Sequence, residues 1–222
     1  MKILAIVGSP RPKGNTNYLV DRALEAAAEL GAQVKKIDLG KYKVNPCLGH
    51  DDCSSFESCT QKDDAIWILD EFLNADGVIL ATPVYWYNVS AQMKAFIDRN
   101  YFPYKHNLEY KAKAVGIIVV AEMEAIEDTL HTLNQFGDWW FDIEEDRKFV
   151  VSGYASRLGD AKKNLTLVEQ AKELGVKMAE SLKGANLPSC PSSPSSVCLS
   201  QVSLYFGRKI ARTGSTLSSR GG

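Results

Sequence analysis

The sequence predicts an α/β protein built on a doubly wound parallel β-sheet. Short, continuously apolar segments alternate with amphipathic segments of helical period along residues 1–183. Strands that are apolar throughout are typical of a parallel sheet covered by helices on both faces. Right-handed crossovers place five such strand–helix units in one five-stranded sheet. We expect the strand order 2-1-3-4-5, in which the connections diverge between strands 1 and 3.

The first unit is a strand over residues 1–7 followed by a helix that begins near Asn17. An apolar stripe at helical spacing runs to Leu30, and Gly31 ends the helix because glycine readily adopts the left-handed conformation. A second strand over residues 33–39 follows, and then a long loop that holds three cysteines.

The later units repeat this alternation. A helix capped by Asp63 or Asp64 precedes a fully apolar strand over residues 77–82. A helix over residues 90–99 comes next, and then an aromatic-rich insert that ends at Tyr110. The last two strand–helix pairs cover residues 114–120 with 122–136 and residues 148–153 with 165–182.

The loop after the first strand has the features of a phosphate site. It reads Gly8-Ser-Pro-Arg-Pro-Lys-Gly-Asn-Thr16 and leads directly into a helix. The first N–H groups of a helix have no partner within it, and the helix dipole favours an anion there. Hydroxyl donors, a glycine for close backbone approach and two cations complete the pattern, on Ser9, Thr16, Gly14, Arg11 and Lys13.

The same loop excludes two common nucleotide sites. A nucleoside-triphosphate loop needs a lysine after its last glycine, where this chain has Asn15. A dinucleotide loop needs three closely spaced glycines, and Gly8 and Gly14 lie too far apart. A single terminal phosphate, as in the mononucleotide FMN, remains. The alternative is an ordinary strand-to-helix turn capped by Asn15 or Thr16.

A second loop with ligand-binding character follows the third strand. Residues 83–90 read Pro-Val-Tyr-Trp-Tyr-Asn-Val-Ser, with large apolar side chains in a row. At the ligand edge of a sheet, a planar heteroaromatic ring offers such side chains a partner. Pro83 stiffens the turn, the backbone N–H groups of residues 84–86 can reach ring atoms, and Asn88 can bind a pyrimidine edge. The alternative is that these aromatic residues cover the core or a subunit interface.

Three segments together carry a family resemblance: the loop over residues 8–16, Thr82-Pro-Val-Tyr-Trp86 and Ser90-Ala-Gln-Met-Lys-Ala-Phe-Ile-Asp-Arg99. They resemble the NADPH-dependent FMN reductase family, and within it the iron–sulfur flavoproteins and their cluster-less relatives. The resemblance implies a flavodoxin-like FMN-binding domain over residues 1–183, noncovalent FMN and a homodimer or tetramer. It implies that the FMN phosphate is held by Ser9, Arg11, Asn15 and Thr16. It also implies that the isoalloxazine ring is lined by Pro83, Val84, Tyr85, Trp86 and Asn88.

The cysteine loop gives an incomplete metal-site pattern. It reads Cys47-Leu-Gly-His50-Asp-Asp-Cys53-Ser-Ser-Phe-Glu-Ser-Cys59. Iron–sulfur flavoproteins carry a compact four-cysteine run, and here His50 stands in the second position. Imidazole replaces thiolate in some iron–sulfur sites and in many zinc sites, so Cys47, His50, Cys53 and Cys59 form a candidate ligand set. Two adjacent aspartates disfavour a cluster of thiolates, and we favour a loop without an iron–sulfur cluster or zinc. Because the loop follows the second strand, we expect it near the flavin.

The aromatic insert predicts contact with a second subunit. Its Tyr101, Phe102, Tyr104 and Tyr110 make it too apolar for an exposed loop. We therefore expect this segment in a subunit interface, where each chain helps to cover the flavin of its neighbour.

Composition limits the partners and the compartment. The formal net charge of -1 gives no indication of a nucleic-acid or membrane partner. The chain has neither a long apolar run nor a signal-peptide pattern, and its odd number of cysteines argues against a disulfide framework. We therefore expect a cytoplasmic protein. Residues 184–222 are rich in Ser and Pro, and we expect a disordered or non-native tail there.

These observations predict an FMN-dependent oxidoreductase. We expect it to take hydride from NAD(P)H and to pass electrons to a flavin, a quinone, ferredoxin or another small acceptor. The cofactor supplies the chemistry, so no side chain is assigned as a catalytic acid or base. The alternative is an electron carrier without its own substrate, of the flavodoxin or iron–sulfur flavoprotein type. The near-neutral charge weighs against a carrier, because carriers dock through strong charge.

Overall fold

The strands form the predicted parallel sheet. The computed structural model describes residues 1–140 and 143–184, so the predicted tail lies outside the described residues from position 185 on. The sheet order is β2-β1-β3-β5-β6, and these neighbours all pair in parallel. This is the predicted order 2-1-3-4-5. The strands are β1 (Lys2–Val7), β2 (Gln33–Asp38), β3 (Gly77–Tyr85), β5 (Ala114–Ala121) and β6 (Lys148–Tyr154).

The predicted count of five strands is one too low for the described residues. A sixth strand, β4 (Asn88–Val89), pairs antiparallel with the end of β3. It places Val84 opposite Val89 and Tyr85 opposite Asn88. A strand of two residues has no alternation of apolar and polar side chains, so the sequence pattern does not reveal it.

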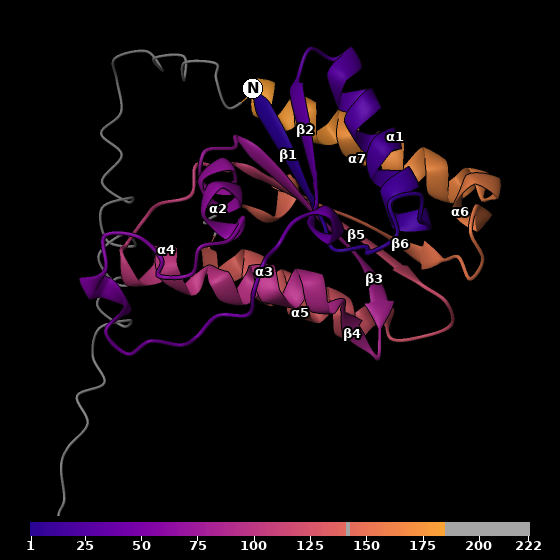
Figure 1. Ribbon diagram of the computed structural model, residues 1–222. Helices are drawn as coiled ribbons and strands as arrows, with labels where there is room; N and C mark the ends of the chain where they lie inside the picture. Colours follow the sequence, from indigo (N-terminus) through magenta and orange to yellow (C-terminus); the bar gives the residue numbers. More distant parts are fainter. Residues whose placement is uncertain (141–142, 185–222) are drawn as a thin grey trace, which may run out of the picture. The chain divides into compact units, whose positions relative to one another are not determined.

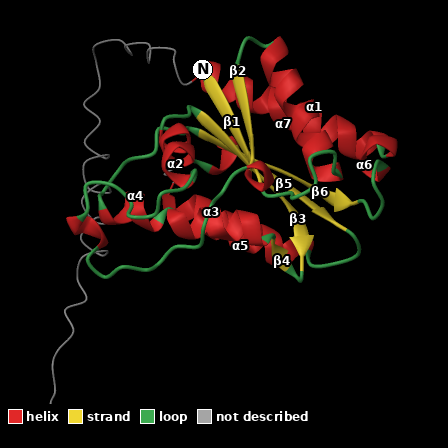
Figure 2. Cartoon of the chain, viewed as in Figure 1, coloured by secondary structure: helices red, strands yellow, loops and turns green. Residues whose placement is uncertain are grey.

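Helices cover both faces of the sheet (Figures 1 and 2). One layer consists of α1 (Asn15–Glu29), α6 (Asp160–Lys163) and α7 (Leu165–Gly184), and the other of α2 (Ala65–Leu73), α3 (Ala91–Arg99) and α5 (Ile126–Trp140). The helix α4 (Tyr101–Lys105) follows α3 directly, and short 3-10 segments lie at Leu39–Lys41, Cys53–Ser55 and Glu145–Arg147. No helix within the described ranges is both long and apolar enough to cross a membrane.

The interior strand β1 shows how the two layers share the sheet. Its residues 3–7 are all 0% exposed. Ile3 and Ala5 pack with α1 and α7, whereas Leu4 and Ile6 pack with α2, α3 and α5. Successive side chains of a strand point to opposite faces, so a strand between two helix layers must be apolar at every position.

Helices α1 and α7 approach each other so closely that their backbones touch at Gly175. A Cβ atom there would lie 1.9 Å from the carbonyl oxygen of Ala23 in α1. Only glycine fits at this position without moving a helix. The contact therefore fixes where α1, and with it the loop before α1, lies on the sheet.

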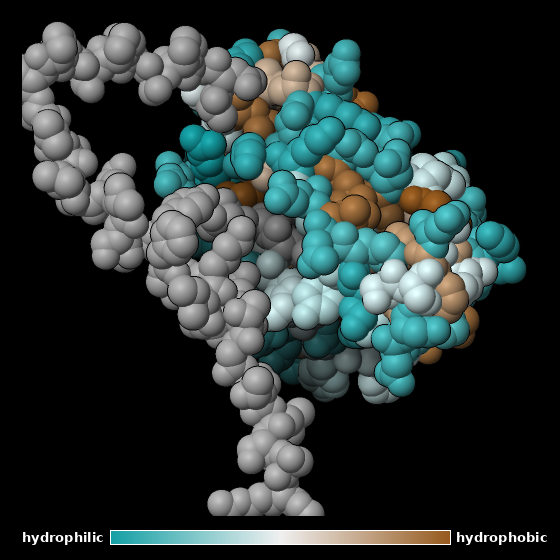
Figure 3. Space-filling model, turned by 90° about the vertical axis from the view of Figure 1, so that its left-hand side faces the viewer, coloured by the Kyte–Doolittle hydropathy of each residue, from teal (hydrophilic) through white to brown (hydrophobic). Residues whose placement is uncertain are grey.

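Part of the aromatic insert packs against other residues of the same chain. The Tyr110 hydroxyl donates to Asn100 Oδ1 at 2.7 Å, its ring meets Phe72 edge-on, and burial raises the pKa of Tyr110 well above its usual value. Tyr110 therefore has packing partners within its own chain, and the predicted subunit interface stays a prediction. Phe102 stacks on His106, with ring centroids 3.9 Å apart. Where described residues are visible on the side of the molecule that carries α4, hydrophobic residues form only small, separate patches (Figure 3).

Candidate functional site

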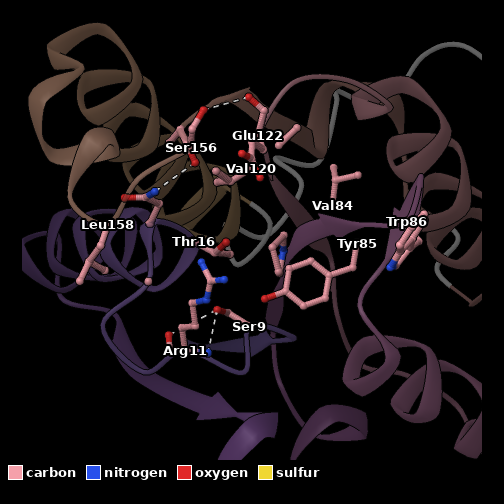
Figure 4. Close-up of a pocket in the computed structure, with 15 residues that line it drawn as sticks. Ser9, Arg11, Thr16, Val84, Tyr85, Trp86, Val120, Glu122, Ser156 and Leu158 are labelled. Atoms are coloured by element: carbon pink, nitrogen blue, oxygen red, sulfur yellow. Dashed lines mark hydrogen bonds between the residues drawn. The ribbon is translucent and has the colours of Figure 1, made fainter.

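A cavity of about 390 Å³ opens at the carboxyl edge of the sheet, next to the ends of β1 and β3 (Figure 4). The loop over residues 8–16 and the loop over residues 83–90 meet there, and we call them the phosphate loop and the ring loop. Apart from Asn88 and the cation Lys13, every residue that the sequence predicts for cofactor binding lines this cavity: Ser9, Arg11, Gly14, Asn15, Thr16, Pro83, Val84, Tyr85 and Trp86.

Asn88 is not among the residues that line the cavity. It lies in β4 with an exposed side chain, and its Oδ1 accepts a hydrogen bond from the N–H of Val89 at 2.7 Å. The structure therefore places Asn88 opposite Tyr85 in the β3–β4 pair but not on the cavity wall.

The cavity also has walls that no motif indicated. The ends of β5 and β6 contribute Val120, Ala121, Glu122, Ala155, Ser156 and Leu158. The Ser156 hydroxyl donates to the Glu122 carbonyl at 3.2 Å and joins these two walls. The predicted sheet order implies this position, because the carboxyl ends of all parallel strands meet at the same edge of the sheet.

The phosphate loop curls around the carbonyl oxygen of Arg11. This oxygen accepts hydrogen bonds from Gly14 N at 2.9 Å, from Asn17 Nδ2 at 3.1 Å and from Ser9 Oγ at 3.3 Å. A Cβ atom at Gly14 would lie 3.0 Å from the same oxygen, so the turn favours glycine. The tight turn brings the start of α1 to the cavity.

The start of α1 has the properties of an anion site. Gly14 is its N-cap residue, and no side chain caps the helix. Ser9 and Thr16 lie beside it, 4% and 2% exposed. Arg11 is in no ion pair among residues 1–140 and 143–184, and Figure 4 shows its side chain directed at Thr16. Free N–H groups, hydroxyls and an uncompensated cation together suit a phosphate.

The Asn15 side chain does not point to a phosphate. Its Nδ2 donates to the carbonyls of Ala155 at 3.2 Å and Arg157 at 2.8 Å. Its Oδ1 accepts from the N–H groups of Gly159 at 3.1 Å and Ala161 at 3.2 Å. These bonds use the full capacity of an amide. Asn15 therefore holds the segment after β6 against the cavity, and only its backbone N–H remains for a ligand.

The ring loop contains a strained turn. Trp86 and Tyr87 connect β3 to β4 with φ angles of 46° and 65°. Such a two-residue turn favours Asn and Gly, and bulky residues in this conformation cost about 1–3 kcal/mol each. Trp86 is also 94% exposed, and a hydrogen bond with Glu124 raises the pKa of the Tyr87 hydroxyl. Backbone strain of this kind clusters at ligand sites.

Tyr85 and Trp86 point in different directions. In Figure 4 the Tyr85 ring reaches into the cavity toward Ser9, whereas Trp86 lies away from the phosphate loop. The cavity therefore has a polar end at Ser9, Arg11 and Thr16 and an apolar wall at the ring loop. A ligand that joins a phosphate to a planar ring matches both ends.

The cysteine loop is placed elsewhere. None of residues 47–59 lines the cavity, so the prediction that this loop lies near the flavin is not met within this chain. Cys59 Sγ accepts a hydrogen bond from Arg99 Nη2 at the end of α3, at 3.2 Å. His50 Nε2 lies 3.2 Å from Thr60 Oγ1.

The predicted metal ligands do not converge. Over residues 1–140 and 143–184, no three His, Cys, Asp or Glu side chains are grouped as a metal site would require. Cys53 is buried, whereas Cys47 and Cys59 are partly exposed. As arranged here, the set does not fit a four-iron cluster. The loop without a cluster stays a prediction.

Comparison with known proteins identifies the family. The family model for NADPH-dependent FMN reductases matches residues 1–152. An iron–sulfur flavoprotein of Methanocaldococcus jannaschii is 35% identical over 192 residues, which cover 82% of this chain and 98% of the relative. One of Archaeoglobus fulgidus is 34% identical over 184 residues, which cover 82% of this chain and 81% of the relative.

Solved structures agree on the fold. An NAD(P)H:quinone oxidoreductase from Methanothermobacter marburgensis is similar with a TM-score of 0.64 at 13% identity, over 80% of this chain and 96% of that one. A flavodoxin from the domain Archaea is similar with a TM-score of 0.53 at 12% identity, over 82% and 99% of the two chains. The match to more than half of the chain shows that this flavodoxin-like protein belongs to the NADPH-dependent FMN reductase family of flavoprotein oxidoreductases.

Proposed function

We propose that the protein binds one FMN per chain in the cavity and transfers hydride from NAD(P)H through it to a flavin, a quinone or another small acceptor. One observation carries this proposal. An uncapped helix start with its hydroxyls and cation, and a loop of aromatic residues, meet around one cavity of about 390 Å³. This volume suits a small cofactor site.

At the polar end, the residues hold the phosphate. The backbone N–H groups of Asn15 and Thr16 and the hydroxyl of Thr16 donate hydrogen bonds. The Ser9 hydroxyl adds a donor when its proton turns from the Arg11 carbonyl, 3.3 Å away, to the phosphate. Arg11 supplies the positive charge, which strengthens binding of an anion. Asn15 contributes a second effect, because its side chain keeps the segment after β6 in place as one wall of the cavity.

At the other end, the ring loop orients the flavin. Pro83, Val84 and Tyr85 line the cavity from one strand, so the ring has one rigid wall. Bound FMN supplies the hydride and electron transfer chemistry. The protein contributes binding, orientation and the exclusion of water, and none of these tasks requires a side chain that acts as an acid or base.

We also propose that the protein works as a homodimer or tetramer in the cytoplasm. Trp86 and Met123 are 94% and 75% exposed, on the ring loop and on the segment after β5. Large exposed apolar side chains near a ligand site support a subunit contact there. The described cysteines are free thiols, which supports a reducing compartment.

Titration of purified protein with FMN tests the binding step, followed by flavin fluorescence. Thr16→Val removes a donor to a charged phosphate, worth about 1.5–3 kcal/mol, so Kd is expected to rise about ten- to hundredfold. Thr132→Val is the matched control, because Thr132 is partly exposed on α5 and its hydroxyl donates to the Asp128 carbonyl in the same helix. Wild-type protein that takes up no FMN would overturn the proposal.

Anaerobic addition of NADPH tests the reaction. A reductase loses the visible absorption of its bound flavin within seconds to minutes of mixing and regains it when an acceptor such as a quinone is added. A pure electron carrier keeps its flavin oxidised under the same conditions. Bound FMN that neither NADPH nor NADH bleaches would therefore leave FMN binding in place and remove the proposed hydride transfer.

A further inference from the structure

The phosphate loop and the ring loop are joined by buried hydrogen bonds at Ser90. The Ser90 hydroxyl donates to the carbonyl oxygen of Gly8, at the start of the phosphate loop, at 2.6 Å. The Ser90 N–H donates to Thr82 Oγ1, directly before the ring loop, at 3.1 Å. Ser90 and Thr82 are both 0% exposed. One residue therefore holds the beginnings of both loops.

Ser90 does more than cap a helix. Its hydroxyl oxygen accepts a hydrogen bond from the N–H of Met93 at 3.2 Å, which caps α3. The donor side of the same hydroxyl is used for Gly8, which directly follows β1. A simple N-cap needs only the acceptor. The bond to Gly8 is the part of the arrangement that capping does not explain.

The space around this contact is closed. A Cβ atom at Gly8 would lie 2.7 Å from Met93 Cβ and 2.8 Å from Ser90 Oγ. The N–H of Gly8 donates to the carbonyl of Ala81 at 2.8 Å, so the end of β1 is also tied to β3. Gly8 thus lies directly against Ser90 and Met93, and the two loops are held together where they begin.

We propose that Ser90 is a positioning residue that sets the separation of the phosphate loop from the ring loop for a ligand that spans both. The inference rests on the proposed FMN site. A ligand with two binding ends gains from both only when the two sites are held at the matching distance before it binds. Loss of the Ser90 side chain therefore weakens the binding of a ligand that uses both loops more than the binding of a ligand that uses the ring loop alone.

FMN and riboflavin form the matched ligand pair, because riboflavin has the same ring and ribityl chain without the phosphate. Kd is measured for both with wild-type protein and with Ser90→Ala. For Ser90→Ala, Kd for FMN is expected to rise about tenfold, the size of one lost buried hydrogen bond. Kd for riboflavin is expected to rise less than about threefold, so the preference for FMN falls.

Asn164→Ala is the control for capping. The Asn164 Oδ1 accepts from the N–H of Leu167 at 3.1 Å and so caps α7, and Asn164 is not among the residues that line the cavity. Its loss is expected to lower the unfolding temperature and to leave both dissociation constants unchanged. If Asn164→Ala also changes the ratio of the dissociation constants for FMN and riboflavin, the inference is overturned.

Thr82→Val provides a second variant with nearly the same shape. It removes the acceptor of the Ser90 N–H and is expected to reduce the FMN preference in the same way. If Ser90→Ala does not fold, Thr82→Val decides the question. Equal weakening of FMN and riboflavin, or no weakening, would overturn the positioning role while FMN binding by wild-type protein stands. Wild-type protein that binds neither flavin would instead remove the proposed function itself.

Discussion

The Arg99 guanidinium and the Asp63 carboxylate form an ion pair that solvent does not reach. Arg99 Nη1 lies 2.5 Å from Asp63 Oδ2, and the two side chains are 1% and 0% exposed. Arg99 also donates to the carbonyl of Asn45 and to Cys59 Sγ, each at 3.2 Å. Asp63 Oδ2 accepts from the N–H of Asn45 at 2.8 Å. The pair therefore ties both ends of the cysteine loop to the end of α3.

Removal of the carboxylate is expected to destabilise the protein strongly. Asp63→Ala leaves the Arg99 charge buried without a counter-ion, which costs about 3–5 kcal/mol. Urea unfolding monitored by circular dichroism measures the change. Glu173→Ala is the control, because Glu173 pairs with Lys177 on the surface, and an exposed pair contributes about 0–1 kcal/mol. Equal effects of the two substitutions would contradict the role of the buried pair.

The same pair predicts a dependence of stability on pH. Burial alone raises the pKa of Asp63, but the hydrogen bonds from Arg99 and Asn45 outweigh it and hold the pKa below its usual value. The stabilisation is therefore fully present above the unfolded pKa of about 3.9 and is lost as pH falls through the lower folded pKa. The difference in unfolding free energy between wild type and Asp63→Asn is expected to shrink below about pH 4. A difference that stays constant over that range would speak against this assignment.

The strained turn predicts a conflict between stability and binding. Replacement of Trp86→Asn together with Tyr87→Gly matches the turn to its backbone angles and is expected to add about 1–2 kcal/mol. For a protein of this size, this raises Tm by about 2–8 °C. Thermal unfolding without flavin measures the gain, and FMN titration is expected to show weaker binding. Leu165→Ala, at a 78% exposed position on α7, serves as the control and should leave Tm nearly unchanged.

The cysteine loop predicts an order of thiol reactivity. Burial raises the pKa of Cys53, and the neighbouring Cys47 and Cys59 raise it further. Iodoacetamide labelling of native protein, mapped by mass spectrometry, should therefore modify Cys53 most slowly. In urea the three thiols should react at similar rates. Protein purified without oxygen is expected to lack stoichiometric iron and acid-labile sulfide, and finding both with all three thiols protected would show that the loop holds a cluster.

The sheet was predictable because burial dictates its composition. A strand covered on both faces must be apolar at each position, and the stretch from Ile3 to Val7 shows this directly. The two-residue β4 and the five-residue α4 were not predictable, since neither is long enough to show a period. The exposed Trp86 and Tyr87 look apolar in sequence, but a backbone with positive φ, not burial, determines their position.

The location of the site was predictable from the sequence, but the roles of its individual side chains were less so. The phosphate loop and the ring loop were found because each carries a local pattern, and both line one cavity. Asn15 shows what a local pattern misses. Its four partners lie some 140 residues or more away in sequence, and only the folded chain reveals that its side chain is fully occupied by them. The walls after β5 and β6 carry no motif at all.

The contact between Gly175 and Ala23 has a consequence for the order of events during synthesis. Helix α1 leaves the ribosome before α7, but the face that carries Ala23 is covered by α7, the last helix in the described part of the chain. Until α7 has been made, α1 lacks the partner that fixes it on the sheet. Helices without their packing partners are only marginally stable in water. The nascent chain is therefore expected to acquire a functional phosphate loop only after α7 has been made, so that a ribosome stalled before residue 175 displays a chain with poor affinity for the cofactor.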